Sequence, residues 1–241
     1  MKKLLIKIYI YFILLIKPFK IKKGFIGSNQ TIKEACDKTK SIIRFGDGEF
    51  RIMFAHKGIH YQDYDKNLAK ELKKIFLNYE INSEYLVCVP SVFFQNIGWF
   101  LKQDKKYAYC FAAPRNHFRK IMKRNLNYGD AFCFSQGKVE EYLKLWKEAK
   151  HLIVIHNDKK WAKMLEINSC KVSFVEIPSK NSYEQIDEIE EKIINIKKKF
   201  NDAKILISAG PMAKVLVYRL SKKNIVSYDV GHCFDEPLEN L

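Results

Sequence analysis

The sequence of 241 residues lacks several features that would narrow its function at once. It has no C-x-x-C pair, no evident linker and no low-complexity tract, and its six cysteines are scattered. Several cysteines sit among apolar residues, as in YLVCVP and YAYCF, which is typical of reduced core thiols in a cytosolic protein. These absences argue against a disulfide framework and a zinc site, and they favour one large domain over two small ones.

Acidic residues are missing from one part of the chain. The formal net charge is +16, and residues 1–23 hold seven lysines but no aspartate or glutamate. Such an excess favours an anionic partner: nucleic acid, an anionic membrane or a phosphorylated substrate. Because much of the excess lies at the N-terminus and no recognised nucleic-acid-binding module is visible, we expect no nucleic-acid partner.

A long apolar run is also missing. The run from Leu4 to Ile16 is interrupted by Lys7, and it is shorter than the roughly 20 residues that span a bilayer. No small-residue cleavage site of a signal peptide follows it. Two interpretations stay open: residues 1–23 bind an anionic cytoplasmic membrane surface, or they form a first helix packed on a single domain of residues 24–241.

The rest of the chain alternates between short β-rich runs and helical stretches. The β-rich runs are Ser41–Phe45, Tyr85–Val89, Tyr107–Phe111, His151–His156, Val172–Ile177, Lys204–Ser208 and Ile225–Tyr228. This alternation predicts an α/β fold with a mostly parallel sheet that helices cover on both faces. In such sheets, ligands bind at the carboxyl ends of strands, near a switch in strand order.

The helical stretches have recognisable starts. Thr31 can form a capping box with the glutamate three residues later, and Ser182 can form one with the glutamine three residues later. From Leu68 to Phe76, apolar residues recur at helical spacing. We therefore predict helices from about residue 31 to 40, around 68–76, and from residue 182 onward.

The first β-rich run ends in two carboxylates. In RFGDGEF, Gly46 lets the chain turn, so that Asp47 and Glu49 emerge at the carboxyl edge of the sheet, and Gly48 allows close approach of a ligand. Carboxylates spaced by one residue can hold a divalent cation against a diphosphate. An ordinary acidic Gly-Asp-Gly turn is the alternative.

Another run also ends in acidic residues. After IVSY come Asp229, His232, Asp235 and Glu236, which offer an imidazole ligand and candidates for a general base. A solvated acidic tail with a surface histidine is the alternative.

Two further run ends precede predicted helices. Gly210 and Pro211 start an apolar helix whose backbone amides could receive phosphate, with Lys214 one turn inside it. Lys180 and Asn181 lie at another helix start, where plain capping needs no ligand. A tight βα turn explains the Gly210 segment equally well.

Three more polar residues lie beside aromatic ones. They are Arg115 in AAPRNHF, and Asp130 and Ser135 in NYGDAFCFSQG. Loop and surface positions are the alternative for all three.

Taken in order, these segments resemble the GT-D glycosyltransferases, a bacterial family first known as a domain of unknown function. The matching segments are IIRFGDGEF, GIHYQDYDKNLAKELKKIF, YGDAFCFSQ, HLIVIHND, IPSKNSYEQI, ISAGPMAKVLVYRL and YDVGH, which together cover roughly residues 30 to 235. The resemblance implies a Rossmann-like fold. It also implies transfer of a hexose from a nucleotide diphosphate sugar, with uridine diphosphate as the expected nucleotide, to a glycan or lipid-linked glycan acceptor.

The resemblance further implies roles for particular residues. Glu49, Asp47 and His232 would bind Mn²⁺ or Mg²⁺. The residues expected to bind the nucleotide sugar are Arg44, Gly46, Asp47, Gly48, Arg115, Ser135, Lys180, Asn181, Gly210, Pro211 and Lys214. With Asp47 and Glu49 as the catalytic motif, Asp235, Glu236 and Asp130 are the candidates for a base that deprotonates the acceptor hydroxyl.

The resemblance and the basic N-terminus together place the protein in the cytoplasm, peripherally at the inner face of a bacterial plasma membrane, in surface polysaccharide, lipooligosaccharide or glycoprotein biosynthesis. Two alternatives remain: a protein that binds nucleotides without catalysis, and a basic nucleic-acid-binding protein.

Overall fold

A computed structural model of the chain describes residues 24–95, 99, 102–103, 105–135, 138–160 and 170–234, together with Leu5, Ile8 and Phe12. At positions 105, 106, 139, 232 and 234 only the backbone is described. Both interpretations of residues 1–23 therefore fall almost entirely outside the described residues. Within the described part, no helix is long and apolar enough to cross a membrane.

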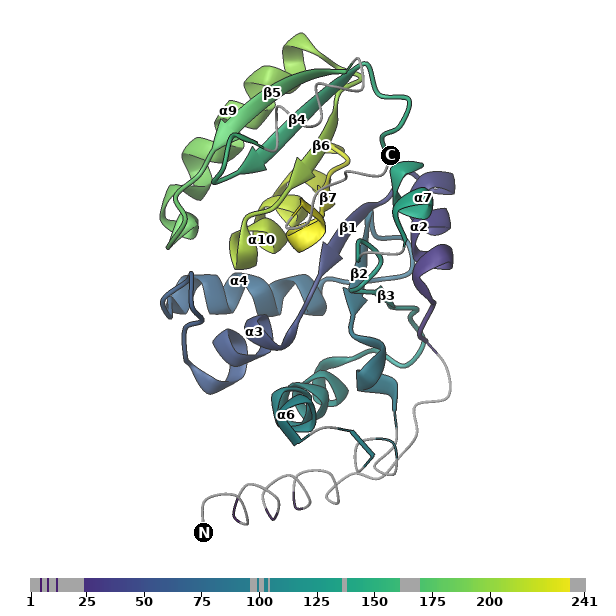
Figure 1. Cartoon of the computed structure of the whole chain (residues 1–241), viewed down its shortest axis with the longest axis vertical. Coiled ribbons are helices and arrows are strands. Elements are labelled where there is room, and N and C mark those ends of the chain that lie inside the picture. The colour runs from purple at the N-terminus through teal and green to yellow at the C-terminus, as the bar shows by residue number, and fades with distance from the viewer. Residues whose placement is uncertain are drawn as a thin grey trace.

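The core of the fold is a seven-stranded sheet in which every described pair of strands is parallel. Its order is β3-β2-β1-β7-β6-β4-β5. The strands are β1 (Ser41–Arg44), β2 (Tyr85–Val89), β3 (Gly129–Asp130), β4 (His151–His156), β5 (Lys171–Glu176), β6 (Lys204–Ile207) and β7 (Tyr228–Asp229). The predicted α/β fold with a mostly parallel sheet is confirmed, and Figure 1 shows the strands fanning across the molecule.

The strand order places a switch point at the centre of the sheet. From β1 the chain moves outward through β2 to β3, and it later returns from the opposite edge through β6 to β7. The last strand therefore pairs with the first, with Ile42 in register with Tyr228. The carboxyl ends of β1 and β7 lie side by side, where such sheets bind their ligands.

Helices cover the sheet because their apolar stripes match its faces. They are α2 (Ser28–Asp37), α3 (Asp47–Phe50), α4 (Lys66–Leu77), α6 (Lys105–Ile121), α7 (Val139–Leu143), α9 (Ile186–Lys199) and α10 (Gly210–Ser221). Short helical turns lie at Arg51–Ala55, Ser91–Phe94, Ser182–Gln185 and Gly231–Phe234. In Figure 1, α2 and α7 lie together near β3, whereas α4 and α10 lie together on the other flank.

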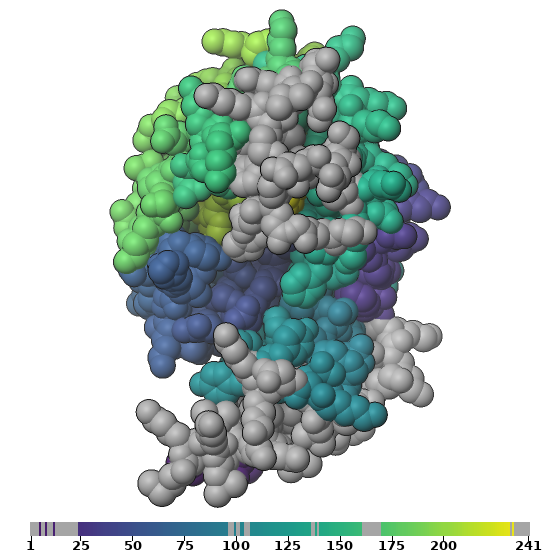
Figure 2. Space-filling model, in the orientation of Figure 1, coloured from purple at the N-terminus to yellow at the C-terminus, as the bar shows by residue number. Residues whose placement is uncertain are grey.

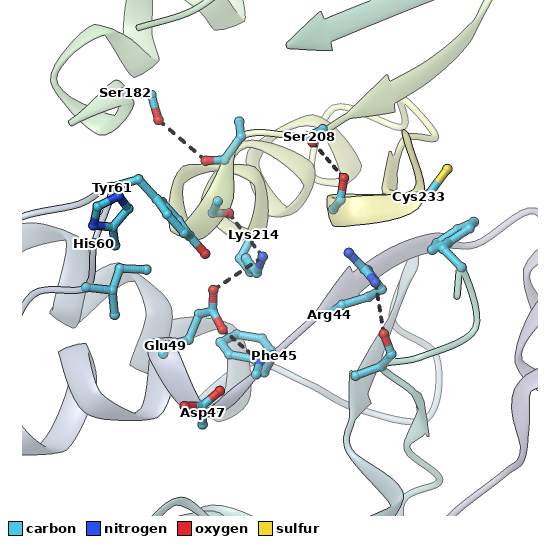
Figure 3. Close-up of a pocket in the computed structure, with 18 of the residues that line it drawn as sticks. Arg44, Phe45, Asp47, Glu49, His60, Tyr61, Ser182, Ser208, Lys214 and Cys233 are labelled. Carbon is cyan, nitrogen blue, oxygen red and sulfur yellow. Dashed lines mark hydrogen bonds and ion pairs between the residues drawn. The ribbon is translucent and has the colours of Figure 1, made fainter. Parts of the chain in front are cut away.

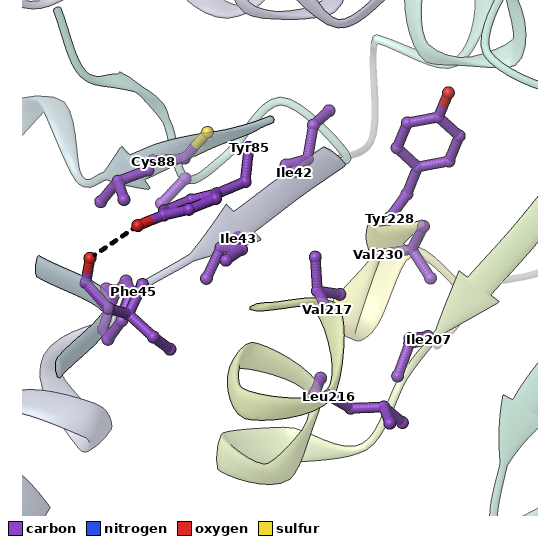
Figure 4. Close-up of a cluster of buried hydrophobic side chains, with 14 of the residues drawn as sticks. Ile42, Ile43, Phe45, Tyr85, Cys88, Ile207, Leu216, Val217, Tyr228 and Val230 are labelled. Carbon is purple, nitrogen blue, oxygen red and sulfur yellow. Dashed lines mark hydrogen bonds between the residues drawn. The ribbon is translucent and has the colours of Figure 1, made fainter. Parts of the chain in front are cut away.

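Helix α10 is the central covering element. Val215, Leu216 and Val217 are fully buried, and α10 packs on β1, β7 and α4. Figure 4 shows Leu216 and Val217 beside Ile43 of β1 and Ile207 of β6. A helix that is apolar on nearly all sides must be enclosed. Its first turn is therefore fixed at the switch point.

Helix α4 confirms its predicted spacing. Leu68, Leu72, Ile75 and Phe76 are buried, and the N-cap residue Asp65 accepts a hydrogen bond from the Leu68 amide at 2.7 Å. The side-chain cap fixes the first turn of the helix. The loop that precedes α4 is therefore anchored at its far end.

One predicted strand is wrong: Tyr107–Phe111 lies inside α6. Buried side chains recur at Ala108, Ala112, Arg115 and Phe118, which is helical spacing. The sequence YAYCF is a short apolar run that fits a strand or a buried helix equally well. The helical spacing of the buried residues that follow it shows that the run belongs to a helix. The two-residue strand β3 was not predicted.

Both predicted capping boxes are also wrong. Helix α2 begins at Ser28, so Thr31 lies inside it, and its hydroxyl donates to the Gly27 carbonyl at 3.0 Å. Ser182 opens a short 3-10 turn that precedes α9, and its hydroxyl donates to the Ala209 carbonyl at 3.4 Å instead of capping a helix. A hydroxyl near a helix start can bond backwards along the chain, which sequence spacing does not reveal.

Candidate active site

A pocket of about 1010 Å³ opens at the carboxyl ends of the central strands. Its walls come from the end of β1 and the start of α3, the loop around residues 59–61, the turn after β3, Phe111 of α6, and the segments that follow β2, β4, β5, β6 and β7. The space-filling view shows α4 and α9 adjoining on one flank of the molecule and α2 on the other (Figure 2). Segments far apart in the sequence thus meet at one cavity.

The Gly46-Asp47-Gly48-Glu49 segment forms the turn into α3. Glu49 Oε2 accepts a hydrogen bond from the Gly46 amide at 2.7 Å, so the carboxylate closes back over the helix start. Acidic residues are stabilised there by the helix dipole. Glu49 is only 5% exposed, and it is held in place before any ligand binds.

Lys214 is the cation next to Glu49 (Figure 3). Its Nζ lies 3.3 Å from Glu49 Oε1 and 3.2 Å from Asp229 Oδ2, and it donates to the Gly210 carbonyl at 3.0 Å. Burial alone would lower the pKa of Lys214, but the Asp229 and Glu49 carboxylates outweigh it and hold this pKa above its usual value. Lys214 is therefore a charged ammonium shared between α3 and β7.

Arg44 joins three strands at the same edge. Its Nε donates to the Asp229 carbonyl at 2.6 Å, and its NH1 donates to the Ala131 carbonyl at 2.9 Å. Its own backbone amide donates to Asp229 Oδ2 at 3.0 Å. Burial would lower the pKa of Arg44, and Asp229 reverses this effect and raises it. We call Arg44, Glu49, Lys214 and Asp229 the charged cluster; it contains two cations and two carboxylates.

Gly231 makes room for this cluster. Its φ is +51°, and a Cβ built on it would lie 1.6 Å from Arg44 NH2. Only glycine adopts this conformation freely and leaves the space empty.

Asp47 also lines the pocket but belongs to no described ion pair. Burial and the neighbouring Glu49 carboxylate raise the pKa of Asp47. A carboxylate in this position gains stability from any cation that enters the pocket. The described residues contain no group of three or more histidine, cysteine or acidic side chains arranged to hold a metal ion.

Two carboxylates still suit Mg²⁺ or Mn²⁺ chemically, because magnesium sites in phosphate-transferring enzymes use one or two carboxylates together with substrate phosphates and water. The predicted third ligand, His232, lies in the short turn after β7, and its side chain is outside the described residues. Asp235 and Glu236 lie wholly outside the described residues.

Lys180 and Asn181 do not line the pocket as the structure describes it. Lys180 pairs with Asp63 at 3.1 Å, and the Asn181 amide group donates to Asp63 Oδ2 at 3.0 Å. Asn181 also accepts from the Asp63 amide at 2.8 Å, and its own amide donates to the Tyr61 carbonyl at 3.0 Å. These two residues hold the loop of residues 56–65 in place.

Tyr61, which this loop carries, was not predicted as a site residue. Figure 3 shows its ring between Ser182 and the Glu49–Lys214 pair. A Cβ on Gly210, whose φ is +54°, would lie 2.5 Å from the Tyr61 ring. Gly210 therefore serves close packing of a tyrosine at the start of α10. The signal in the sequence was one of two tyrosines in GIHYQDY, and aromatic residues in loops are too common to single it out.

Some of the remaining predicted site residues line the pocket, and others do not. Ser135 lines the pocket, as do Gly46, Gly48 and Gly210. Asp130 does not; it accepts from Ser28 Oγ and from the Phe132 amide, and it pairs with Lys138 at 3.4 Å. Arg115 is a fully buried residue of α6 that donates to the Gln95 carbonyl at 2.6 and 3.1 Å, and it lines no part of the pocket.

An α/β sheet with a charged pocket at its switch point is the architecture of nucleotide-dependent enzymes, and comparison with known proteins defines the class. Residues 42–237 match the family described as glycosyltransferases of the GT-D fold. The chain belongs to this family.

Two curated relatives are similar over most of the chain. A probable glycosyl transferase, Gly, of Streptococcus gordonii is 26% identical over 243 residues, which is 92% of this chain and 34% of the relative. The glycosyltransferase GlyD of Streptococcus pneumoniae serotype 4 is 29% identical over 232 residues, or 87% of this chain and 27% of GlyD. The chain thus spans about a third or less of the length of these relatives.

Solved structures agree on the fold. A domain of unknown function 1792 with a distinct glycosyltransferase fold superposes with a TM-score of 0.72 at 26% identity, over 88% of this chain and 79% of that one. A glycosyltransferase of Streptococcus sanguinis superposes with a TM-score of 0.71 at 24% identity, over 88% of this chain and 82% of that one. These matches confirm the predicted GT-D fold.

Proposed function

We propose that this chain transfers a hexose from a nucleotide diphosphate sugar, with uridine diphosphate as the nucleotide, to a glycan acceptor in bacterial surface glycan biosynthesis, and that a bound Mn²⁺ or Mg²⁺ assists. The observation that carries the proposal is the meeting of Asp47, Glu49 and Lys214 in one pocket at the switch point of the sheet. Membership of the glycosyltransferase family supports the class of reaction.

In this proposal the cationic residues face the diphosphate, and the carboxylates hold the metal ion. As the bond from sugar to diphosphate breaks, the leaving nucleoside diphosphate gains negative charge, and preformed positive groups lower the barrier. Lys214 and the amino end of α10 would face that charge, with Arg44 behind them. Asp47 and Glu49 would hold the metal ion, which supplies further neutralisation of the diphosphate.

The same proposal accounts for the ion pair between Lys214 and Glu49. Without substrate, each buried charge needs a partner, because an unpaired buried charge is strongly destabilising. The Lys214 ammonium lies within salt-bridge distance of both Glu49 and Asp229, so Asp229 keeps it paired when Glu49 turns to a metal ion. The cluster is thus charged and stable in both states.

A general base would be needed if transfer inverts the anomeric carbon. Asp235 and Glu236 remain the candidates for it. Asp130 is a weaker one, because it lies outside the pocket and its carboxylate is engaged by Lys138 and the Phe132 amide.

Calorimetry with uridine diphosphate, with and without Mn²⁺, tests the proposal. We expect metal-dependent binding, and we expect Glu49→Gln to weaken it about tenfold or more, because a charge-assisted contact is lost. Glu188→Gln is the matched control, since Glu188 is an exposed residue of α9 that pairs only with Lys192 among the described residues. The metal assignment would be contradicted if the affinity for uridine diphosphate were the same with and without Mn²⁺, or if Glu49→Gln left it unchanged.

A screen of nucleotide sugars for hydrolysis and transfer separates the enzyme from a protein that only binds nucleotides. Turnover by the wild type and its loss in Glu49→Gln would support the enzyme. Tight binding of uridine diphosphate without turnover of any sugar nucleotide would instead favour the non-catalytic alternative.

The proposed cytoplasmic, membrane-peripheral location is tested by sedimentation with anionic liposomes. We expect removal of residues 1–23, which carry seven lysines, to abolish binding. Unchanged binding of the shortened chain would contradict this location.

A further inference from the structure

The wall of the pocket built by the turn after β3 differs from the charged cluster. It presents Ala131, Phe132, Phe134 and Ser135, and Phe111 of α6 and Pro90 line the same cavity. Phe132 is 43% exposed, although it is among the most hydrophobic side chains. An exposed ring that lines a cavity together with further apolar residues offers an apolar contact surface to a ligand.

The turn fixes the backbone of Phe132. The Phe132 amide donates to Asp130 Oδ1 at 2.9 Å, and the Phe132 carbonyl accepts from Ser135 Oγ at 2.8 Å and from Lys138 Nζ at 3.0 Å. Asp130 is itself fixed, because its amide donates to the buried Thr31 hydroxyl at 2.9 Å. Both backbone groups of Phe132 are thus satisfied while its ring stays exposed. A residue whose backbone is already ordered loses less entropy on binding.

The turn is also tied to the charged cluster. Arg44 NH1 donates to the Ala131 carbonyl at 2.9 Å, and the Arg44 guanidinium lies over the Phe134 ring at 5.4 Å. Phe134 is buried against Tyr142 and Trp146, at centroid distances of 5.6 and 6.1 Å. The two walls are therefore parts of one framework, and the backbone of Phe132 has a fixed place relative to Glu49 and Lys214.

We propose that Phe132 is the platform of the acceptor subsite, on which the apolar C–H face of a pyranose ring of the acceptor glycan lies. This inference rests on the proposed function, because a glycosyltransferase must hold an acceptor beside its donor. The pocket, at about 1010 Å³, lies at the upper end of ligand pockets, so it has room for more than one substrate.

The charged cluster and the turn after β3 differ in chemistry, and each fits a different substrate. The charged cluster suits a diphosphate, whereas aromatic faces carry negative electrostatic potential and attract the C–H groups of a sugar rather than phosphate oxygens. The hydroxyl of Ser135 beside Phe132 can hydrogen-bond a sugar hydroxyl. In this scheme Asp130 and Lys138 are positioning residues for the turn that carries Phe132.

Saturation-transfer NMR with methyl glucoside, methyl galactoside and methyl N-acetylglucosaminide, each at millimolar concentration with uridine diphosphate and Mn²⁺ present, tests the subsite. We expect signal from the C–H protons of one sugar face in the wild type. Phe132→Ala should weaken glycoside binding about fivefold, the size of one aromatic contact, and Phe132→Trp should restore it. Tyr109→Ala, which removes a 53% exposed ring of α6 outside the pocket, should leave it unchanged.

Calorimetry on the same variants should give affinities for uridine diphosphate within about twofold of the wild type, because Phe132 is assigned to the other substrate. Equal glycoside binding by wild type and Phe132→Ala, no glycoside binding by the wild type, or an equal loss of nucleotide and glycoside binding would each overturn the inference. Failure of the proposed function would show differently: wild-type protein would then neither bind uridine diphosphate nor turn over a nucleotide sugar.

Discussion

The two walls of the pocket are built in opposite ways. The charged cluster is buried, and Arg44 and Lys214 are paired with Asp229 and Glu49 across β1, β7 and α10. The turn after β3 exposes an aromatic ring, and only its backbone and the residues beneath it are fixed. The charged cluster is therefore part of the stability of the fold, whereas the ring that the turn after β3 exposes contributes little to it. Substitutions in the two walls should therefore differ in their effect on the free energy of unfolding.

The largest effect is expected at Asp229. It is fully buried between Arg44 and Lys214, and Asp229→Asn removes the charge that compensates both. Leaving a buried ion without its partner costs about 3–5 kcal/mol, so the free energy of unfolding should fall by about that amount in urea denaturation. Asp187→Asn is the control, because that carboxylate pairs with Arg219 but is 89% exposed. An equal, small effect of both changes would mean that the charged cluster is not integral to the fold.

Gly231→Ala should have the next largest effect. The new methyl group would meet Arg44 NH2 at a residue whose φ is +51°, so both the backbone and the guanidinium must shift. Strain at such a position costs about 1–3 kcal/mol, measured as a lower urea midpoint with an unchanged slope. Gly27→Ala is the control, since nothing lies within 4 Å of its Cβ position. No difference between the two variants would show that Arg44 can move freely.

The loop that carries Tyr61 should give a smaller and local effect. Asn181→Gly keeps the positive φ of 56° and removes the amide group that holds Asp63. We expect faster proteolysis within residues 56–65, and a rise of about fivefold in KM for the donor, because both side-chain hydrogen bonds to Asp63 are lost and the loop that carries Tyr61 is held less firmly. Asn224→Gly is the matched control, an asparagine with a φ of 58° that does not line the pocket. Equal proteolysis of the two variants would contradict the role assigned to Asn181.

The sequence predicted those parts of the site that depend on local order. Asp47 and Glu49 follow an apolar run and glycine directly, and Lys214 lies one turn inside a helix, so their places at the sheet edge could be inferred. The partners of Asp229 depend on the pairing of the first strand with the last, and no local pattern encodes that order. Tyr61 reaches the pocket on a loop that Asn181, 120 positions away, helps to hold in place. The sequence also predicts Arg115 and Asp130 as site residues, because each is a polar residue among aromatic ones. In the structure both instead satisfy backbone groups inside the fold, a role that the same pattern fits equally well.

The smallest effect on folding is expected at Phe132, and it separates the two walls most directly. Phe132→Ala removes a ring that is already 43% exposed, so the free energy of unfolding should change by about 1 kcal/mol or less. Phe134→Ala, two residues along the same turn, removes a ring that is 2% exposed and should cost about 3–5 kcal/mol. Both values come from urea denaturation of the full chain. If Phe132→Ala destabilised the fold as much as Phe134→Ala, its ring would be a packing element, and a loss of glycoside binding in that variant could follow from a disordered turn. With folding unchanged, the same loss can only report the surface that Phe132 presents to the acceptor.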